Sequence, residues 1–167
     1  DPIVSQNISE SDFCIKDLMH GEKPTTLYLV VPPNDQVRLK PLLRVLFNQF
    51  LSRMTSEMEF EEGAVKKHYS HRLLLLLDEF TSIGKLEVFE KGLAFMAGYG
   101  LKAFIIIQDL TQLQKEYGKD EAITSNCHVR VAFAPNKIET AKVLSDMTGK
   151  TTIVQKKRAA SSDMDKV

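Results

Sequence analysis

The sequence predicts an α/β fold in which a mostly parallel sheet is flanked by helices. Apolar runs alternate with segments of helical period along the chain, which is typical of strand-helix-strand units. Five consecutive leucines, at 73–77, form an apolar block that suits a strand buried on both faces. Periodicity alone also allows a buried helix here, and the block is too short to cross a membrane.

The composition limits the class of protein. The 167 residues are enough for one domain with its own core. Hydrophobic residues make up 43% and charged residues 26% of the chain, as in an ordinary soluble globular protein. Lys+Arg and Asp+Glu both total 22, so no global basic field indicates nucleic acid or membrane, although a local patch or a ring of subunits stays compatible with DNA. No signal peptide or membrane span is visible, and the chain lacks an initiator Met, so we expect a piece of a longer protein.

The first third of the chain predicts a linker, a strand and a long helix. Residues 1–24 read as the end of an upstream all-α region or a linker, with a short helix capped by Ser11 or Asp12. The β-rich run Thr26–Val31 predicts the first strand, which two prolines end. A helix then begins at about residue 40, because Pro41 fits only near a first turn. Its apolar stripe consists of Leu39, Leu43, Leu46, Phe50 and Met54.

The remaining elements follow from the same patterns. In chain order they are a solvated loop at 57–70, the leucine strand, a helix with the apolar face Leu86, Phe89, Leu93 and Met96, a strand at Phe104–Ile107, a short helix with Leu110, Leu113 and Tyr117, a more exposed strand at 128–133, a helix from about Lys137 to Met147, a strand at Thr151–Val154 and a disordered polar tail at 155–167.

Two carboxylates directly follow the leucine run. Asp78 and Glu79 stand where the strand would emerge at its C-terminal end, the edge at which ligands bind in open α/β sheets. Several apolar residues followed by Asp-Glu is the pattern of a Walker B strand. In such a strand one acid positions hydrated Mg²⁺ and the other polarises the attacking water. The alternative is a core strand that ends in two solvated acids.

A glutamine follows the next strand. If the strands at 73–77 and 104–107 are parallel, Gln108 reaches the same sheet edge as Asp78. Phosphoryl-transfer sites use such a glutamine to sense the γ-phosphate or to orient water. The alternative is an ordinary turn residue. Asp78, Glu79 and Gln108 are therefore the predicted catalytic residues, with ATP and Mg²⁺ as the predicted cofactors.

The phosphate-binding loop that such a site requires is missing from the chain. The motif is G-x-x-x-x-G-K-[ST], running from a strand into a helix. The G-K-T triplet at 149–151 follows a predicted helix, and Leu144 stands where the first glycine is needed. We interpret Gly149 as a helix C-cap and the triplet as a chance match.

Several segments, taken together and in order, resemble one family. They include S-D-F-C-I-K-D-L-M, L-Y-L-V-V-P-P-N-D, L-K-P-L-L-R-V-L-F-N-Q, H-R-L-L-L-L-L-D-E-F-T-S-I-G-K-L, F-M-A-G-Y-G-L-K, I-I-I-Q-D-L-T-Q-L and N-C-H-V-R-V-A-F-A. With them, the chain resembles the TraG-type coupling proteins of bacterial conjugation and type IV secretion, relatives of the FtsK/HerA motor ATPases. The similarity runs from about Asp1 to Val154.

The resemblance implies a RecA-like P-loop NTPase core, of which residues 25–154 would be the second half and whose Walker A segment would precede residue 1. It implies that Asp78 supports Mg²⁺ through water, that Glu79 activates water and that Gln108 senses the γ-phosphate. Some relatives carry an arginine finger before the Gln strand, whereas no arginine occurs here between Arg72 and Arg130. The candidate contacts to DNA or to a neighbouring subunit are Lys85, Lys102 and Arg130.

The same resemblance implies an ATP-driven, DNA-translocating coupling protein that delivers relaxase-bound single-stranded DNA to a type IV secretion channel. The implied partners are single- or double-stranded DNA, the relaxase, the channel proteins and five further copies in a homo-hexamer. The implied location is the cytoplasmic face of the bacterial inner membrane, with the anchor outside this chain, which is itself expected to be soluble and inactive alone. Two alternatives stay open: a non-catalytic docking module for the relaxase or the channel, and a septum-type chromosome pump.

Overall fold

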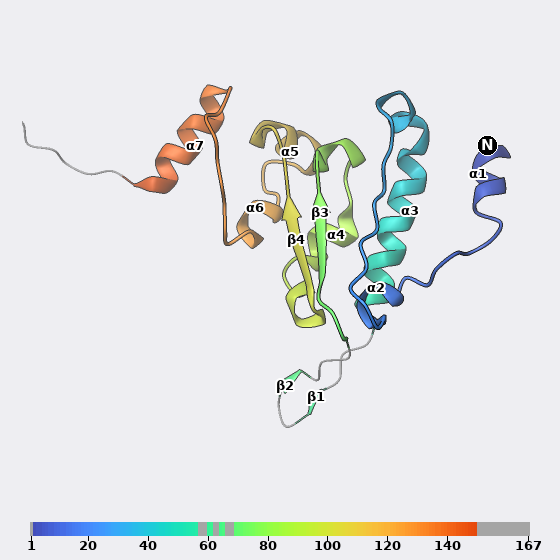
Figure 1. The fold of residues 1–167 in the computed structure, drawn as a ribbon. Coiled ribbons are helices and arrows are strands. Elements are labelled where there is room, and N and C mark those ends of the chain that lie inside the picture. The colour runs from blue at the N-terminus through green and yellow to red at the C-terminus, as the bar shows by residue number, and fades with distance from the viewer. Residues whose placement is uncertain (1, 57–59, 62–63, 66–68, 150–167) are drawn as a thin grey trace, which may run out of the picture.

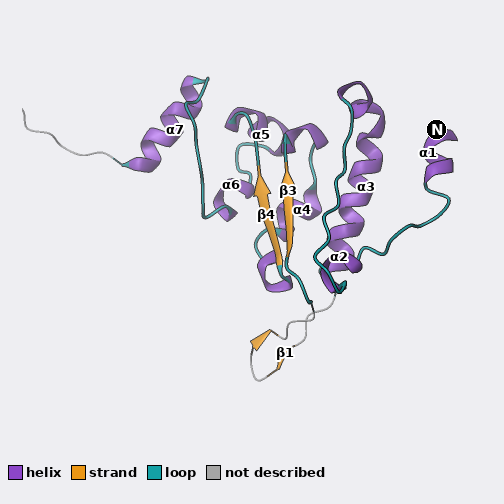
Figure 2. Ribbon diagram, viewed as in Figure 1, coloured by secondary structure: helices purple, strands orange, loops and turns teal. Residues whose placement is uncertain are grey.

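The computed structural model describes residues 2–56, 60–61, 64–65 and 69–149. Its elements are drawn in Figures 1 and 2, where η denotes a short 3-10 helix. In chain order they are α1 Pro2–Asn7, α2 Asp17–His20, η1 Pro33–Asp35, α3 Gln36–Met54, β1 Phe60–Glu61, β2 Ala64–Val65, β3 Leu73–Leu77, η2 Phe80–Ile83, α4 Glu87–Gly92, η3 Met96–Tyr99, β4 Leu101–Ile105, α5 Leu110–Tyr117, α6 Ile123–Asn126 and α7 Ile138–Thr148.

A parallel pair of strands lies at the centre of the molecule. β3 and β4 run side by side in register from Leu73 opposite Leu101 to Leu77 opposite Ile105. The predicted α/β class and the parallel pairing are thus confirmed. The second sheet is a small antiparallel pair, β1 with β2, which lies within the stretch predicted as a loop.

Only one face of the β3–β4 pair is covered, so the prediction of a strand buried on both faces is wrong. Leu77 is 5% exposed, whereas Leu74 and Leu76 are 58% and 63% exposed. Phe104 on β4 is 53% exposed in the same way. Successive side chains of a strand point to opposite faces, and the described residues pack against one face alone.

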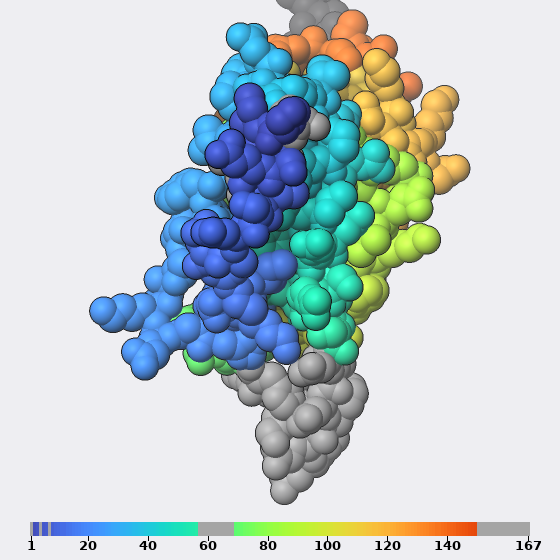
Figure 3. All heavy atoms as spheres, turned by 90° about the vertical axis from the view of Figure 1, so that its right-hand side faces the viewer, coloured from blue at the N-terminus to red at the C-terminus, as the bar shows by residue number. Residues whose placement is uncertain are grey.

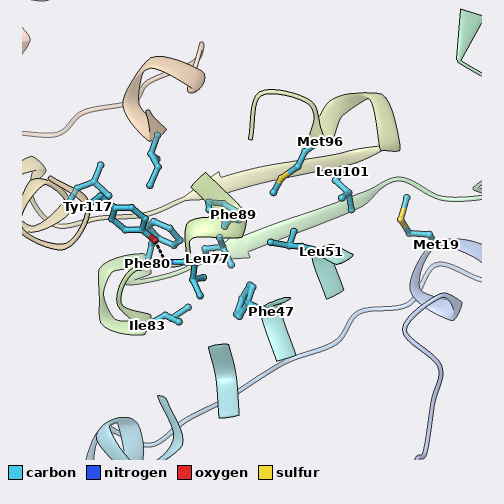
Figure 4. Close-up of a cluster of buried hydrophobic side chains, with 13 residues drawn as sticks. Met19, Phe47, Leu51, Leu77, Phe80, Ile83, Phe89, Met96, Leu101 and Tyr117 are labelled. Atoms are coloured by element: carbon cyan, nitrogen blue, oxygen red, sulfur yellow. Dashed lines mark hydrogen bonds between the residues drawn. The ribbon is translucent and has the colours of Figure 1, made fainter. Parts of the chain in front are cut away.

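The core lies on the covered face, between the sheet and helices α3, α4 and α5 (Figure 4). It is built from aliphatic and aromatic side chains of most described elements: Met19, Phe47, Leu51, Leu77, Phe80, Ile83, Leu86, Phe89, Met96, Leu101, Leu113, Tyr117 and Ile123. Phe80 and Phe89 are 0% exposed. Each such side chain contributes about 1.5–3 kcal/mol of hydrophobic stabilisation relative to an exposed position.

Two predicted strands are not strands. Thr26–Val31 and residues 128–133 are drawn as loops, and no described backbone ladder joins either segment to a neighbour (Figure 2). Tyr28 is 79% exposed and Val129 is 86% exposed. Both segments have the residue pattern of a strand, but a strand also needs an edge to pair with. The predicted strand Thr151–Val154 and the tail 155–167 lie outside the described residues.

Several predicted element ends are also corrected. α3 begins at Gln36, not near residue 40, and holds Pro41 in its second turn. That position is tolerated because the carbonyl that loses its partner belongs to Val37, whose side chain is 87% exposed. α2 has Lys16 at its N-cap without a side-chain bond, so neither Ser11 nor Asp12 caps it.

In the second half, the helix predicted over 86–96 ends as α4 at Gly92, and η3 continues its buried face. β4 begins at Leu101, three residues before the predicted start. The helices predicted near 110–117 and 137–147 are confirmed as α5 and α7. Gly149 ends α7 at φ 83°, which confirms the helix C-cap interpretation. The sequence patterns did not predict α1 or α6.

The N-terminal residues lie on the outer side of α3. Figure 3 shows the blue N-terminal segment lying across the surface in front of the cyan α3. Within the described part of the chain, no helix is both long enough and apolar enough to cross a membrane.

Candidate functional site

The ends of the two parallel strands meet at one edge of the sheet. Gln108 donates a hydrogen bond from Nε2 to Oε1 of Glu79 over 2.7 Å. The two residues are 29 positions apart in the sequence. The prediction that the acids and the glutamine share a sheet edge is therefore confirmed.

The buried residue Phe80 anchors the turn that follows β3 to the core. The Phe80 N–H donates to the Ile106 carbonyl at 3.1 Å, and the Ile106 N–H donates to the Leu77 carbonyl at 3.0 Å. The Phe80 ring stacks on Tyr117 at 5.6 Å between centroids and packs against Phe89 at 5.1 Å (Figure 4). Burial of this residue fixes the backbone on which its neighbour Glu79 stands exposed.

Glu79 is held in a strained backbone conformation. Its φ and ψ are 45° and 47°, and among the described residues other than glycine it is the one with a positive φ. The Asp78 carboxylate accepts from the Glu79 N–H at 3.0 Å, and the Glu79 carbonyl accepts from the Ser82 N–H at 2.7 Å. Such a conformation costs about 1–3 kcal/mol and persists where surrounding contacts enforce it, commonly at functional sites.

A cavity of about 320 Å³ opens beside the pair of Glu79 and Gln108. Its lining is polar and comes from η2, α5 and the two strand ends: Glu79, Thr81, Ser82, Gln108, Gln112, Lys115 and Glu116. Thr81 Oγ1 donates to Gln112 Oε1 at 3.4 Å, which joins the two sides. The volume is at the lower end of the range for small-molecule sites.

Sequence reasoning missed five of these lining residues. Gln112, Lys115 and Glu116 follow one another at i, i+3 and i+4 on α5, so they share the helix face that begins beside Gln108. That spacing is a signal that could have identified them. Thr81 and Ser82 follow the acids directly, but their position in η2 depends on the turn that Phe80 anchors.

Tyr117 fastens α5 to the turn after η2. Its hydroxyl accepts from the Leu86 N–H at 3.0 Å and donates to the Gly84 carbonyl at 3.3 Å. Burial raises the pKa of Tyr117 to about 12, so this hydroxyl keeps its proton at neutral pH. The turn after η2 is therefore tied to α5 by a protonated hydroxyl that both accepts and donates a hydrogen bond.

The carboxylates offer hard oxygen ligands of the kind that Mg²⁺ prefers. Asp78 and Glu79 are both exposed, so each keeps oxygens that can face a ligand. Among the described residues no group of three or more His, Cys, Asp or Glu side chains could hold a metal ion. A divalent cation here would therefore take most of its ligands from a nucleotide and from water.

The three candidate cations are not brought to this cavity. Lys102 pairs with Leu74 near the start of the sheet, at the end opposite Gln108. Arg130 donates from Nε to the Cys127 carbonyl at 3.0 Å and from Nη2 to the Thr124 carbonyl at 2.7 Å. Lys85 is half-buried beyond η2. Lys115, which was not predicted from the sequence, supplies a cation to the lining.

Comparison with known proteins gives a consistent set of relatives. The model of the family described as Type IV secretory system Conjugative DNA transfer matches residues 1–166. A conjugal transfer protein TraG of Escherichia coli is 51% identical over 164 residues, 96% of this chain and 26% of that protein. The protein VirD4 of Rhizobium radiobacter is 37% identical over 155 residues, 91% of this chain and 21% of that protein.

A more distant relative is the type IV secretion system-coupling protein VirD4 of Bartonella henselae, 26% identical over 145 residues. The chain spans about a quarter or less of the length of the curated relatives it matches, at 26% and 21%. No solved structure matches the chain.

Proposed function

Because the chain belongs to the type IV secretory system conjugative DNA transfer family, we propose that it carries the Walker B half of an ATP-driven motor. The parent would be a coupling protein that moves DNA to a type IV secretion channel. The names of the relatives, conjugal transfer protein and type IV secretion system-coupling protein, support the transport role. The RecA-like fold belongs to this proposal, and the parallel β3–β4 pair supports it.

One observation carries the catalytic part of the proposal. The Gln108 amide contacts the Glu79 carboxylate at 2.7 Å, at the C-terminal edge of two parallel strands. Ligands bind at this edge in open α/β sheets. The left-handed backbone of Glu79 supports the same assignment, since strain of this kind is concentrated at functional sites.

Each residue then has a distinct role. Glu79 accepts a proton from water and orients it, and Gln108 holds the Glu79 carboxylate and presents its own amide to the terminal phosphate. Asp78 would hold Mg²⁺ through water. When ATP and Mg²⁺ are bound, water would add to the terminal phosphorus as its bond to the ADP oxygen breaks, Glu79 would take the proton of that water, and Mg²⁺ would neutralise the charge that develops on the phosphates. The phosphate-binding loop has to come from outside this chain, because the chain has no G-x-x-x-x-G-K-[ST] segment.

The remaining parts of the proposal concern partners and location. We propose that the parent binds single- or double-stranded DNA and the relaxase, assembles as a homo-hexamer and lies at the cytoplasmic face of the inner membrane. Lys85, Lys102 and Arg130 remain candidate contacts to DNA or to a neighbouring subunit. Arg130 is already bonded to two carbonyls, which favours a structural role over a mobile one.

The test is the ATPase activity of the parent protein, measured with and without single-stranded DNA. Glu79→Gln is expected to abolish turnover while nucleotide binding stays intact. Glu87→Gln is the matched control, because Glu87 is exposed in the first turn of α4 and outside the cavity lining. Normal hydrolysis by Glu79→Gln would refute the catalytic role of Glu79, whereas a wild-type parent without ATPase activity would favour the docking-module alternative.

A further inference from the structure

A buried carboxylate directly follows Gln108, and the proposed reaction does not use it. Asp109 is 8% exposed, whereas Gln108 is exposed. The backbone of Asp109 is extended, at φ −157° and ψ 140°. Neighbouring side chains in extended backbone point to opposite sides, so Gln108 lies toward the cavity and Asp109 toward the interior.

The Asp109 carboxylate binds two different elements. Its Oδ1 accepts from the Thr111 N–H at 2.7 Å, which caps the N-terminus of α5. The same oxygen accepts from Thr140 Oγ1 of α7 at 3.0 Å, and Lys137 Nζ lies 4.0 Å away. Lys137 Nζ also donates to Thr111 Oγ1, which closes the group into a network.

This network attaches α7 to α5. Thr140 is the buried residue of that helix, at 9% exposure, whereas Ile138 is 84% and Met147 is 49% exposed. At the other end of α7, Arg130 Nη1 donates to Met147 Sδ at 3.5 Å. Hydrogen bonds at Thr140 and at Met147 thus join α7 to other segments, and the buried bond, that of Thr140, ends on Asp109, the residue next to Gln108.

We propose that Asp109 is a positioning residue that holds the Gln108 amide against the Glu79 carboxylate by fastening the end of β4 to α5 and α7. The inference rests on the proposed function, because it concerns the geometry of the proposed catalytic pair. Because Asp109 contacts Thr111, Thr140 and Lys137, the peptide bond between Gln108 and Asp109 has little freedom to rotate. The 2.7 Å contact of Gln108 is then set before any ligand binds.

The state of the carboxylate supports this role. The hydrogen bond from the Thr111 backbone holds the pKa of Asp109 below its ordinary value of 3.8. The bonds from the side chains of Thr111 and Thr140 and the charge of Lys137 lower this pKa further, against desolvation. Asp109 is therefore ionised at neutral pH and binds its donors as a charged acceptor.

The experiment uses the full-length parent and four variants. Asp109→Ala removes the acceptor, Asp109→Asn keeps an acceptor that also caps helices, and Thr140→Val removes one donor at almost constant volume. Thr148→Val is the matched control, because Thr148 is exposed on the same helix and its Oγ1 donates within that helix, to the Ser145 carbonyl at 2.8 Å. kcat and KM for ATP are measured for each, together with thermal unfolding.

The expected result is a fall in kcat without a change in KM. Asp109→Ala should lower kcat about tenfold or more, since small displacements of catalytic groups have effects of this size. Asp109→Asn should recover most of this loss. The kcat of Thr140→Val should lie between those of Asp109→Ala and the wild type, and the kcat of Thr148→Val should match the wild type. Full turnover by Asp109→Ala, a joint loss of nucleotide binding, or no recovery by Asp109→Asn would overturn the proposal.

A second readout needs no nucleotide. Amide hydrogen exchange of the ligand-free parent is followed by mass spectrometry over residues 105–112 and 137–148. Asp109→Ala should raise exchange in both segments together, and Thr148→Val should raise it in neither. Unchanged protection of 105–112 in Asp109→Ala would overturn the inference. A wild-type parent without ATPase activity would instead refute the proposed function, and the exchange data would still decide the role of Asp109.

Discussion

The backbone of Glu79 links stability to function at the level of a single residue. At φ 45° a glutamate is strained, whereas asparagine adopts this conformation more readily. In a Gln108→Ala background, where the amide partner of Glu79 is absent, Glu79→Asn is expected to stabilise the chain by about 1 kcal/mol. Urea unfolding of the 167-residue chain measures this change.

The control substitution has the opposite expected sign. Glu87→Asn places the same residue at a helical position, in the first turn of α4, where asparagine is a weaker helix former. It should therefore destabilise by a few tenths of a kcal/mol. Equal destabilisation by both substitutions would contradict the strain at residue 79.

Asp109 makes stability depend on pH on the acid side. Its pKa in the folded state lies below the ordinary 3.8, so its contribution is present above pH 3.8 and is lost as the pH falls through the folded value. The difference in unfolding free energy between wild type and Asp109→Asn should be largest near neutral pH and shrink below 3.8. Urea titrations at several pH values test this. The exposed Asp120→Asn serves as control, and a difference that grows on acidification would contradict the assignment.

The residues of the candidate site were predictable to different degrees. Asp78, Glu79 and Gln108 stand directly after apolar runs, so a parallel sheet brings them together whatever the loops do. The network of Asp109, Thr140 and Lys137 was not predictable, since it joins residues 31 positions apart through the docking of two helices. Local periodicity carries no information about that docking.

Gly100 sets the start of β4 relative to β3. It ends η3 at φ 80°, and its carbonyl accepts from the Leu73 N–H at 3.1 Å. A Cβ at this position would lie 2.5 Å from ring atoms of Tyr69. Gly100→Ala is therefore expected to cost about 2–4 kcal/mol, combining left-handed strain with a steric clash.

A double-mutant cycle separates the two causes. In a Tyr69→Ala background the ring is gone and only the strain is left, so Gly100→Ala should cost about 1 kcal/mol there. Denaturant unfolding of the four proteins gives the coupling free energy. Additive effects would mean that the ring moves aside without cost.

Helices and strands were predicted well where all the residues that they pack against belong to this chain. β3, β4 and α5 each bury a face against residues of the same chain, and their patterns identified them, although β4 begins three residues earlier than its apolar run suggested. Thr26–Val31 and 128–133 have equally good strand patterns, but their ladders need edges that the described residues do not offer. Propensity describes what a segment can become, and pairing decides whether it does.

At the scale of the whole molecule, the apolar surface is divided unevenly. One face of the sheet is packed into the core, while the other exposes Leu74, Leu76 and Phe104 at 58%, 63% and 53%. The extended segment beyond α6 exposes Val131 and Phe133 at 77% and 88%. Leu74, Leu76 and Phe104 are neighbours on the paired strands, and clustered exposed apolar side chains of this kind favour association.

This surface predicts how the isolated 167-residue chain behaves in solution. It should bind an apolar dye and self-associate with rising concentration, because water contacts the open face of the sheet. Leu74→Thr with Leu76→Thr keeps the strand propensity and removes the apolar side chains, so dye binding and association should both fall. The unfolding free energy should change by less than about 0.5 kcal/mol, since neither leucine packs in the core.

Val37→Thr is the control for this experiment. Val37 is 87% exposed on α3, away from the sheet, and its replacement should leave dye fluorescence and sedimentation unchanged. If the double variant sediments and binds dye like the wild type, association comes from another surface and the open sheet face is not its cause.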